Sequence, residues 1–202
     1  MKPLSDIYKN SFFGKRNKLQ WRVNPLCSAV IKTFGLTQMD SIVDAGCAIG
    51  DFIKGFKDAG LTAYGLEGSI SAFDFLVTDD IYLVDLRELI SENHYISEFL
   101  SAAISLEVAE HIEPEFAQNY VKNLCFFSNH ILISAAPPGQ KGHHHVNCQP
   151  KEYWEDLFKQ EGFKRSPEKE EIFRNELKDF KKKKGLSGYY NNVLIFERGE
   201  ND

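Results

Sequence analysis

The chain has 202 residues, 43% of them hydrophobic, which suits one compact domain with a substantial core. Its 24 basic and 29 acidic residues give a formal net charge of -5, so nucleic acid is not an expected partner because no overall positive field would attract a polyanion. The amino terminus lacks the apolar run of a signal peptide and no segment has the length of a membrane span, so we expect a cytoplasmic protein without membrane contact.

Four cysteines are widely separated, without the close pairs that zinc ribbons or redox motifs require. Cys27, Cys47, Cys125 and Cys148 are therefore expected to be buried thiols in a reducing compartment. The sequence carries no signal that indicates an oligomeric state.

Residues 1–40 show no strand pattern, and we expect a helical or irregular segment there, ahead of the sheet. Its aromatic side chains Phe12, Phe13 and Trp21 are available to cover a cleft. Residues 41–202 would then form the main domain.

From residue 41 onward, short β-like runs alternate with segments of helical period, a pattern that predicts a mostly parallel sheet in a doubly wound α/β fold. The seven β-like runs are Ser41–Ala45, Thr62–Leu66, Ile81–Val84, Ala102–Leu106, His130–Ala135, Gly162–Arg165 and Asn192–Glu197. Apolar residues at helical spacing predict helices at Phe52–Ala59, Phe116–Phe127, Tyr153–Phe158 and Ser166–Lys184. The lysines at 181–184 suit the carboxyl end of the last helix.

The first β-like run breaks into a loop that contains Gly46 and Gly50 and then opens a helix. Gly46 allows a sharp turn and close approach of a ligand, and Gly50 allows a tight helix start with free amide groups. Glu67 ends the next run, where a carboxylate can accept both hydroxyls of a ribose. This combination predicts a nucleotide or nucleoside site.

These residues resemble the first two motifs of the class I S-adenosylmethionine-dependent methyltransferases, whose loop reads Asp-x-Gly-x-Gly-x-Gly. Asp44, Gly46 and Gly50 match, and Ala48 replaces the middle glycine. A dinucleotide loop reads Gly-x-Gly-x-x-Gly and lacks an acid at the position of Asp44, which would suit the ammonium group of S-adenosylmethionine. The resemblance implies a seven-stranded Rossmann-like methyltransferase sheet with helices on both faces.

The resemblance also implies which residues bind the donor, S-adenosylmethionine, and its product, S-adenosylhomocysteine. Asp85, after the third strand, would contact the adenine; alternatively it caps a helix that begins near Leu86. The implied donor-binding residues are Asp44, Ala45, Gly46, Cys47, Gly50, Phe52, Glu67, Gly68, Asp85, Leu86 and Leu106.

Acidic residues and histidines follow the fourth and fifth strands, on the side that would hold the methyl acceptor. Glu107, Glu110 and His111 form a Glu-x-x-Glu-His stretch, and the three would share one face of a helical turn. Three histidines, 143–145, follow the fifth strand, and neighbouring strands can bring such loops together.

This arrangement resembles the metal site of small-RNA 2′-O-methyltransferases and ubiquinone-pathway O-methyltransferases, which implies Glu107, Glu110, His111 and one loop histidine as metal ligands. The sequence does not decide among His143, His144 and His145, and we take His144 as the candidate. Alternatively Glu110 and His111 only stabilise the loop, as in metal-free relatives. We expect no metal, and instead a histidine base whose pKa lies near working pH. The catalytic candidates are His144, His143, His145, His111 and Glu107.

The predicted function is methyl transfer to a hydroxyl of a small polar molecule or a glycan sugar. An RNA 2′-O-methyltransferase with a metal site is an alternative, which the acidic sequence pI of about 5.7 disfavours. A non-catalytic domain that binds adenosyl nucleosides is another, since a fold can persist without activity, and Ala48 is its support.

Overall fold

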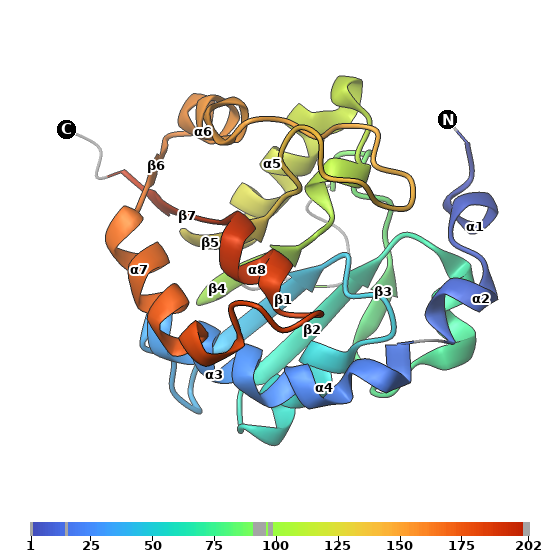
Figure 1. The fold of residues 1–202 in the computed structure, drawn as a ribbon, viewed down its shortest axis with the longest axis horizontal. Coiled ribbons are helices and arrows are strands. Elements are labelled where there is room, and N and C mark those ends of the chain that lie inside the picture. The colour runs from blue at the N-terminus through green and yellow to red at the C-terminus, as the bar shows by residue number, and fades with distance from the viewer. Residues whose placement is uncertain (1, 15, 91–95, 97–98, 200–202) are drawn as a thin grey trace.

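The computed structural model describes residues 2–14, 16–90, 96 and 99–199, which form one sheet in the order β3-β2-β1-β4-β5-β7-β6 (Figure 1). The strands are β1 (Ser41–Ala45), β2 (Thr62–Glu67), β3 (Ile81–Leu83), β4 (Ala102–Leu106), β5 (His130–Ser134), β6 (Phe163–Arg165) and β7 (Val193–Arg198). The pairs among β1 to β5 are parallel, whereas β7 lies antiparallel between β5 and β6. All seven predicted strands are present, each within one residue of its expected bounds, and the predicted fold class is confirmed.

The strand order reverses between β1 and β4, which are neighbours although β2 and β3 lie between them in the sequence. In sheets of this kind the loops at the carboxyl ends of two such strands diverge and leave a crevice where ligands bind. The loops that follow Ala45 and Leu106 therefore form the walls of the candidate site.

Helices cover both faces of the sheet (Figure 1). The longer helices are α3 (Val23–Phe34), α4 (Asp51–Asp58), α5 (Ala117–Phe127), α6 (Lys151–Gln160), α7 (Pro167–Glu176) and α8 (Ser187–Asn192). Successive residues of a strand point to opposite faces, so Val43 of β1 packs into the cluster under α5 and α6, while Ile42 packs into the cluster under α3, α4 and α7.

The last predicted helix ends earlier than expected. α7 stops at Glu176, a short 3-10 turn, η5 (Lys178–Phe180), follows, and the lysines at 181–184 lie in turns, so their assignment to a helix end is wrong. The reason is tertiary: the Phe180 ring stacks on the Trp21 ring at 6.2 Å, and Lys183 Nζ lies 3.8 Å from the centre of the Trp21 ring. The helix α8 was not predicted, because its sequence has no apolar period.

The segment ahead of the sheet has two parts. α3 belongs to the core, since Leu26, Ala29 and Val30 are completely buried. Before it, α1 (Leu4–Ile7) and α2 (Asn10–Phe13) lie along the edge of the molecule near β3 (Figure 1). The 3-10 helix η1 (Arg16–Arg22) then leads into α3, and its Trp21 stacks on Phe180.

All four cysteines are free thiols, and three are buried as expected. Cys148 is instead partly exposed. Among the described residues, no helix is long and apolar enough to cross a membrane.

Candidate donor and acceptor site

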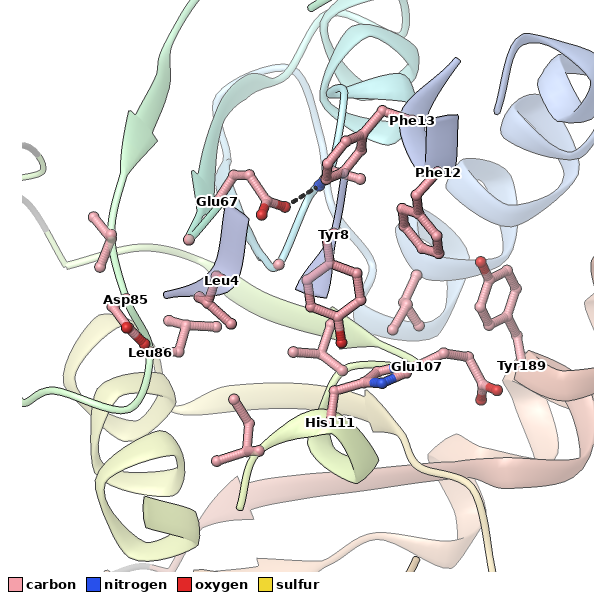
Figure 2. A pocket seen from close by; sticks show the side chains of 17 residues that line it. Leu4, Tyr8, Phe12, Phe13, Glu67, Asp85, Leu86, Glu107, His111 and Tyr189 are labelled. Atoms are coloured by element: carbon pink, nitrogen blue, oxygen red, sulfur yellow. Dashed lines mark hydrogen bonds between the residues drawn. The ribbon is translucent and has the colours of Figure 1, made fainter. Parts of the chain in front are cut away.

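A cavity of about 220 Å³ lies where the carboxyl ends of β1, β2 and β4 meet the amino-terminal segment (Figure 2). Of the implied donor-binding residues, six line this cavity: Gly46, Glu67, Gly68, Asp85, Leu86 and Leu106. The others lie in the same strand-loop-helix unit but outside the cavity wall: Asp44, Ala45, Cys47, Gly50 and Phe52. The two motifs of the sequence thus come together around one hollow.

The glycine loop has an unusual backbone. Gly46 and Gly50 have φ angles of 87° and 83°, and Ala48 has a φ of 54°. A side chain at Gly46 would collide with Val108, so this position requires glycine. Ala48 adopts the left-handed conformation that a glycine would enter freely, at a cost of roughly 1–2 kcal/mol for a residue with a Cβ.

Glu67 fixes this loop from the end of β2. Its side chain is largely buried, its Oε2 accepts the N–H of Ala48 at 2.8 Å, and its Oε1 accepts the N–H of Ser69 at 2.7 Å. A carboxylate has about four acceptor positions, and that of Glu67 also lines the cavity. Figure 2 shows the carboxylate beside the loop.

Asp85 immediately precedes a turn at Leu86 and Arg87, and no helix begins between Leu86 and Ile90, where the described stretch ends, so the alternative helix-cap assignment near Leu86 is wrong there. The Asp85 carboxylate accepts the backbone N–H of Arg87 at 3.0 Å and pairs with its guanidinium at 2.6 Å. Arg87 is buried, and its guanidinium also lies 3.3 Å from a Glu113 oxygen and 3.2 Å from the Lys2 carbonyl oxygen. This arginine, which sequence analysis missed, links Asp85 in the cavity wall to the amino-terminal segment.

Glu107 begins the acceptor wall, immediately after β4. Its φ is 55°, and its N–H donates to the carbonyl and hydroxyl oxygens of Ser134, at 3.0 and 2.9 Å. Its carboxylate lines the cavity and accepts the Asn192 amide at 3.2 Å and the Gln140 amide at 3.4 Å. β5 therefore holds the backbone of Glu107, while α8 and the loop after β5 hold its side chain at the cavity.

His111 lies at the end of the 3-10 turn η3 (Ala109–His111). Of the four histidines predicted to be catalytic, all of which the structure describes, His111 alone lines the cavity. Its Nδ1 lies 3.0 Å from the carbonyl oxygen of His144. A carbonyl oxygen only accepts, so Nδ1 carries the hydrogen and Nε2 carries the lone pair. Burial lowers the pKa of His111 to about 4, which is consistent with a neutral ring.

Glu110 is completely buried behind this wall. Burial, together with the nearby charge of Glu107, raises the pKa of Glu110 to about 8, although the backbone amides of Glu110 and Ala136 partly offset the effect. Neither carboxylate oxygen has a hydrogen-bond partner of ordinary geometry in the part of the chain that the structure describes. The His145 Nε2 lies 3.9 Å from Oε1.

The side chains of the three loop histidines have different neighbours. His143 is exposed, with its Nε2 3.1 Å from the Ile7 carbonyl oxygen, and His144 has a φ of 55° and presents its carbonyl oxygen to His111. His145 alone joins Glu110 and His111 in a group whose possible ligand atoms lie within 4.8 Å of one another. Glu107 and His144, two of the implied metal ligands, lie outside this group.

The amino-terminal segment supplies cavity residues that sequence analysis missed or left without a role. Leu4, Tyr8, Phe12 and Phe13 line the cavity, whereas Trp21 lies away from it. The Tyr8 hydroxyl is buried, has no hydrogen-bond partner among the described residues, and points toward His111 (Figure 2). Burial also raises the pKa of Tyr8, so the phenol is neutral. No local pattern in the sequence marks Tyr8.

No protein-family profile and no curated protein matches the sequence. Among solved structures, DesVI of Streptomyces venezuelae matches with a TM-score of 0.65 and 12% identity, over 98% of this chain and 100% of that one. Magnesium protoporphyrin IX methyltransferase (ChlM) of Synechocystis PCC 6803, with bound SAH, matches with a TM-score of 0.64 and 15% identity, over 97% and 98%. The sugar N-methyltransferase KedS8 of a Streptoalloteichus species matches with a TM-score of 0.63 and 11% identity, over 94% and 92%.

At identities this low the similarity establishes the fold, and it extends over nearly the whole chain. The resemblance to class I S-adenosylmethionine-dependent methyltransferases is therefore confirmed at the level of the fold. The roles of individual residues rest on the geometry of the cavity.

Proposed function

We propose that the protein transfers a methyl group from S-adenosylmethionine to a hydroxyl of a small polar molecule, such as a sugar. The observation that carries the proposal is one cavity with Glu67 and Asp85 at one end and Glu107 and His111 at the other (Figure 2). A similar structure, ChlM, is described with bound SAH and with bound SAM. The first end suits the nucleoside and the second suits the acceptor.

Binding of the donor would use groups that are already in place. The carboxylate of Glu67 would accept the ribose hydroxyls while it keeps its bonds to the glycine loop. Asp85 and Leu86 would contact the adenine, and Gly46 would allow close approach of the backbone.

The cavity of about 220 Å³ is smaller than the roughly 300–1,000 Å³ of common small-molecule sites. Leu4 packs against Gly68 and Tyr8 lines the same wall. We therefore expect the amino-terminal segment to shift outward when donor and acceptor bind.

Methyl transfer from a sulfonium is an in-line displacement whose leaving group is a neutral thioether, so alignment is the main requirement. A hydroxyl acceptor must also lose a proton. Glu107 and His111 are the predicted catalytic residues that line the cavity; a carboxylate is a proton acceptor, and the hydrogen bond at Nδ1 of His111 leaves the lone pair on its Nε2. This pair supports a hydroxyl acceptor over a neutral amine, which attacks without a base.

Two experiments test the proposal. First, S-adenosylmethionine and S-adenosylhomocysteine should each raise the melting temperature, because a ligand at 100 times its Kd adds about 2.7 kcal/mol to the free energy of unfolding. NAD should leave the melting temperature unchanged. Second, a labelled methyl group should pass to a small molecule in a host extract, and mass analysis should place it on oxygen.

Absence of any shift with either adenosyl ligand would refute the donor assignment. Label on nitrogen, as for a sugar N-methyltransferase such as KedS8, or on RNA would refute the acceptor assignment alone. Ligand binding without transfer to any component would favour the non-catalytic alternative.

A further inference from the structure

A buried carboxylate, Glu110, meets two histidines behind the acceptor wall. The side chains of Glu110, His111 and His145 each offer one ligand atom, and these atoms lie within 4.8 Å of one another. Glu110 is 0% exposed, and neither of its oxygens has a hydrogen-bond partner of ordinary geometry within the described part of the chain. An isolated buried carboxylate is costly, so this geometry calls for a cation or a proton.

Both histidines are oriented as metal ligands are. Nδ1 of His111 faces the carbonyl oxygen of His144 at 3.0 Å, and Nδ1 of His145 faces the carbonyl oxygen of Gln140 at 3.0 Å. These carbonyls only accept, so each Nδ1 carries its hydrogen and each Nε2 keeps a lone pair. A backbone carbonyl on the second nitrogen is the usual partner of a histidine that binds metal.

One ligand pair has nearly the spacing that two ligands have on a bound ion, and all three ligand atoms lie within 4.8 Å of one another. His145 Nε2 and Glu110 Oε1 are 3.9 Å apart, whereas two ligands of a tetrahedral zinc, each at about 2.0–2.1 Å, lie roughly 3.4 Å apart. A closure of about half an ångström would bring them into coordination distance. The loop is already fixed nearby, because the N–H groups of Val146 and Asn147 both donate to the backbone oxygen of Glu110, each at 3.0 Å.

We infer that Glu110, His111 and His145 bind one divalent transition-metal ion, with zinc the best match. Two imidazoles and one carboxylate suit zinc, iron or manganese better than magnesium, which prefers oxygen ligands. Three protein ligands leave a position open, and His111 borders the cavity. The set differs from the one that the sequence implied, since His145 replaces His144 and Glu107 is not a ligand.

The inference deepens the proposed function and rests on it for its chemical role. A hydroxyl bound to a divalent ion loses its proton more readily. Glu107, held at the cavity by Asn192 and Gln140, would then receive that proton.

The test uses the full chain without an added histidine tag, stripped with a chelator and titrated calorimetrically with zinc, manganese and magnesium chlorides. Zinc should bind at one ion per chain and more tightly than magnesium. Glu110→Gln and His145→Asn should each weaken zinc binding by roughly 100-fold or more, because loss of a direct ligand costs at least as much as loss of its outer partner.

His144→Asn is the matched control, since it alters the neighbouring ring and leaves the backbone oxygen beside His111; it should bind zinc like the wild type. Circular dichroism confirms that each variant is folded. Absence of zinc binding by the wild type, or equal zinc binding by wild type and His145→Asn, would overturn the inference. Titration with S-adenosylhomocysteine separates the two proposals: nucleoside binding without zinc refutes only the metal site, and zinc binding without nucleoside refutes only the donor site.

Discussion

Replacement of Glu67 by glutamine tests the donor site most directly. The two oxygens of Glu67 accept the N–H groups of Ala48 and Ser69 at 2.8 and 2.7 Å. Glutamine has one acceptor oxygen, so its NH2 group would face one of these two donors. A hydrogen bond to a charged group contributes about 1.5–3 kcal/mol, and we expect Glu67→Gln to lower the free energy of unfolding by about that amount.

Affinity for S-adenosylhomocysteine should fall as well, because the glutamine would accept fewer ribose hydroxyls. A loss of about 1.5–3 kcal/mol corresponds to a Kd raised roughly 10- to 150-fold. Urea unfolding measures the first effect, and calorimetric titration well below the unfolding transition measures the second. Glu115→Gln, at an exposed position outside the cavity wall, is the control. A folded Glu67→Gln protein with unchanged Kd would show that Glu67 does not contact the ribose.

Other substitutions separate binding, chemistry and stability. Tyr8→Phe removes a buried hydroxyl without a described partner, so the free energy of unfolding should stay constant or rise by up to about 1 kcal/mol; marked destabilisation in urea would contradict this. Glu107→Gln should preserve the Kd for S-adenosylhomocysteine and lower kcat by roughly 10²–10⁴-fold; unchanged turnover would exclude Glu107 as the proton acceptor. Glu170→Ala removes the buried carboxylate that lies 2.7 and 2.9 Å from the guanidinium groups of Arg165 and Arg174. Arg165 keeps Glu155 and Arg174 keeps the Tyr190 and Val193 carbonyl oxygens as partners, so the free energy of unfolding should fall by about 1.5–3 kcal/mol; an unchanged urea midpoint would refute it.

Local sequence patterns were sufficient to predict most of the fold. The strands at Ser41–Ala45 and Ala102–Leu106 match their predicted bounds because both are mostly apolar runs in a sheet buried on both faces. The glycine loop could also be predicted from the sequence, because the positive φ angles at Gly46 and Gly50 leave few alternatives to glycine. The carboxyl end of α7 could not be predicted in this way, because it depends on the stacking of Phe180 on Trp21, which is far away in the sequence.

The acceptor side could be predicted only in outline. The sequence places three adjacent histidines after β5 but cannot say which one faces Glu110, since that depends on the left-handed backbone at His144. Tyr8 was missed for a related reason: its carbonyl oxygen accepts the Ser69 hydroxyl at 3.1 Å, a contact between distant parts of the chain. Contacts of this kind leave no period or spacing in the sequence.

Backbone strain marks which parts of the site are preformed. Ala48, Glu107 and His144 all have positive φ angles, although none is glycine, and each lies in a loop at the carboxyl end of a strand. Such conformations cost about 1–3 kcal/mol and persist only where surrounding contacts determine them. Here the N–H of Ala48 is held by Glu67 and that of Glu107 by Ser134. The donor and acceptor walls are thus fixed before ligands arrive, which leaves the amino-terminal segment as the part that adjusts.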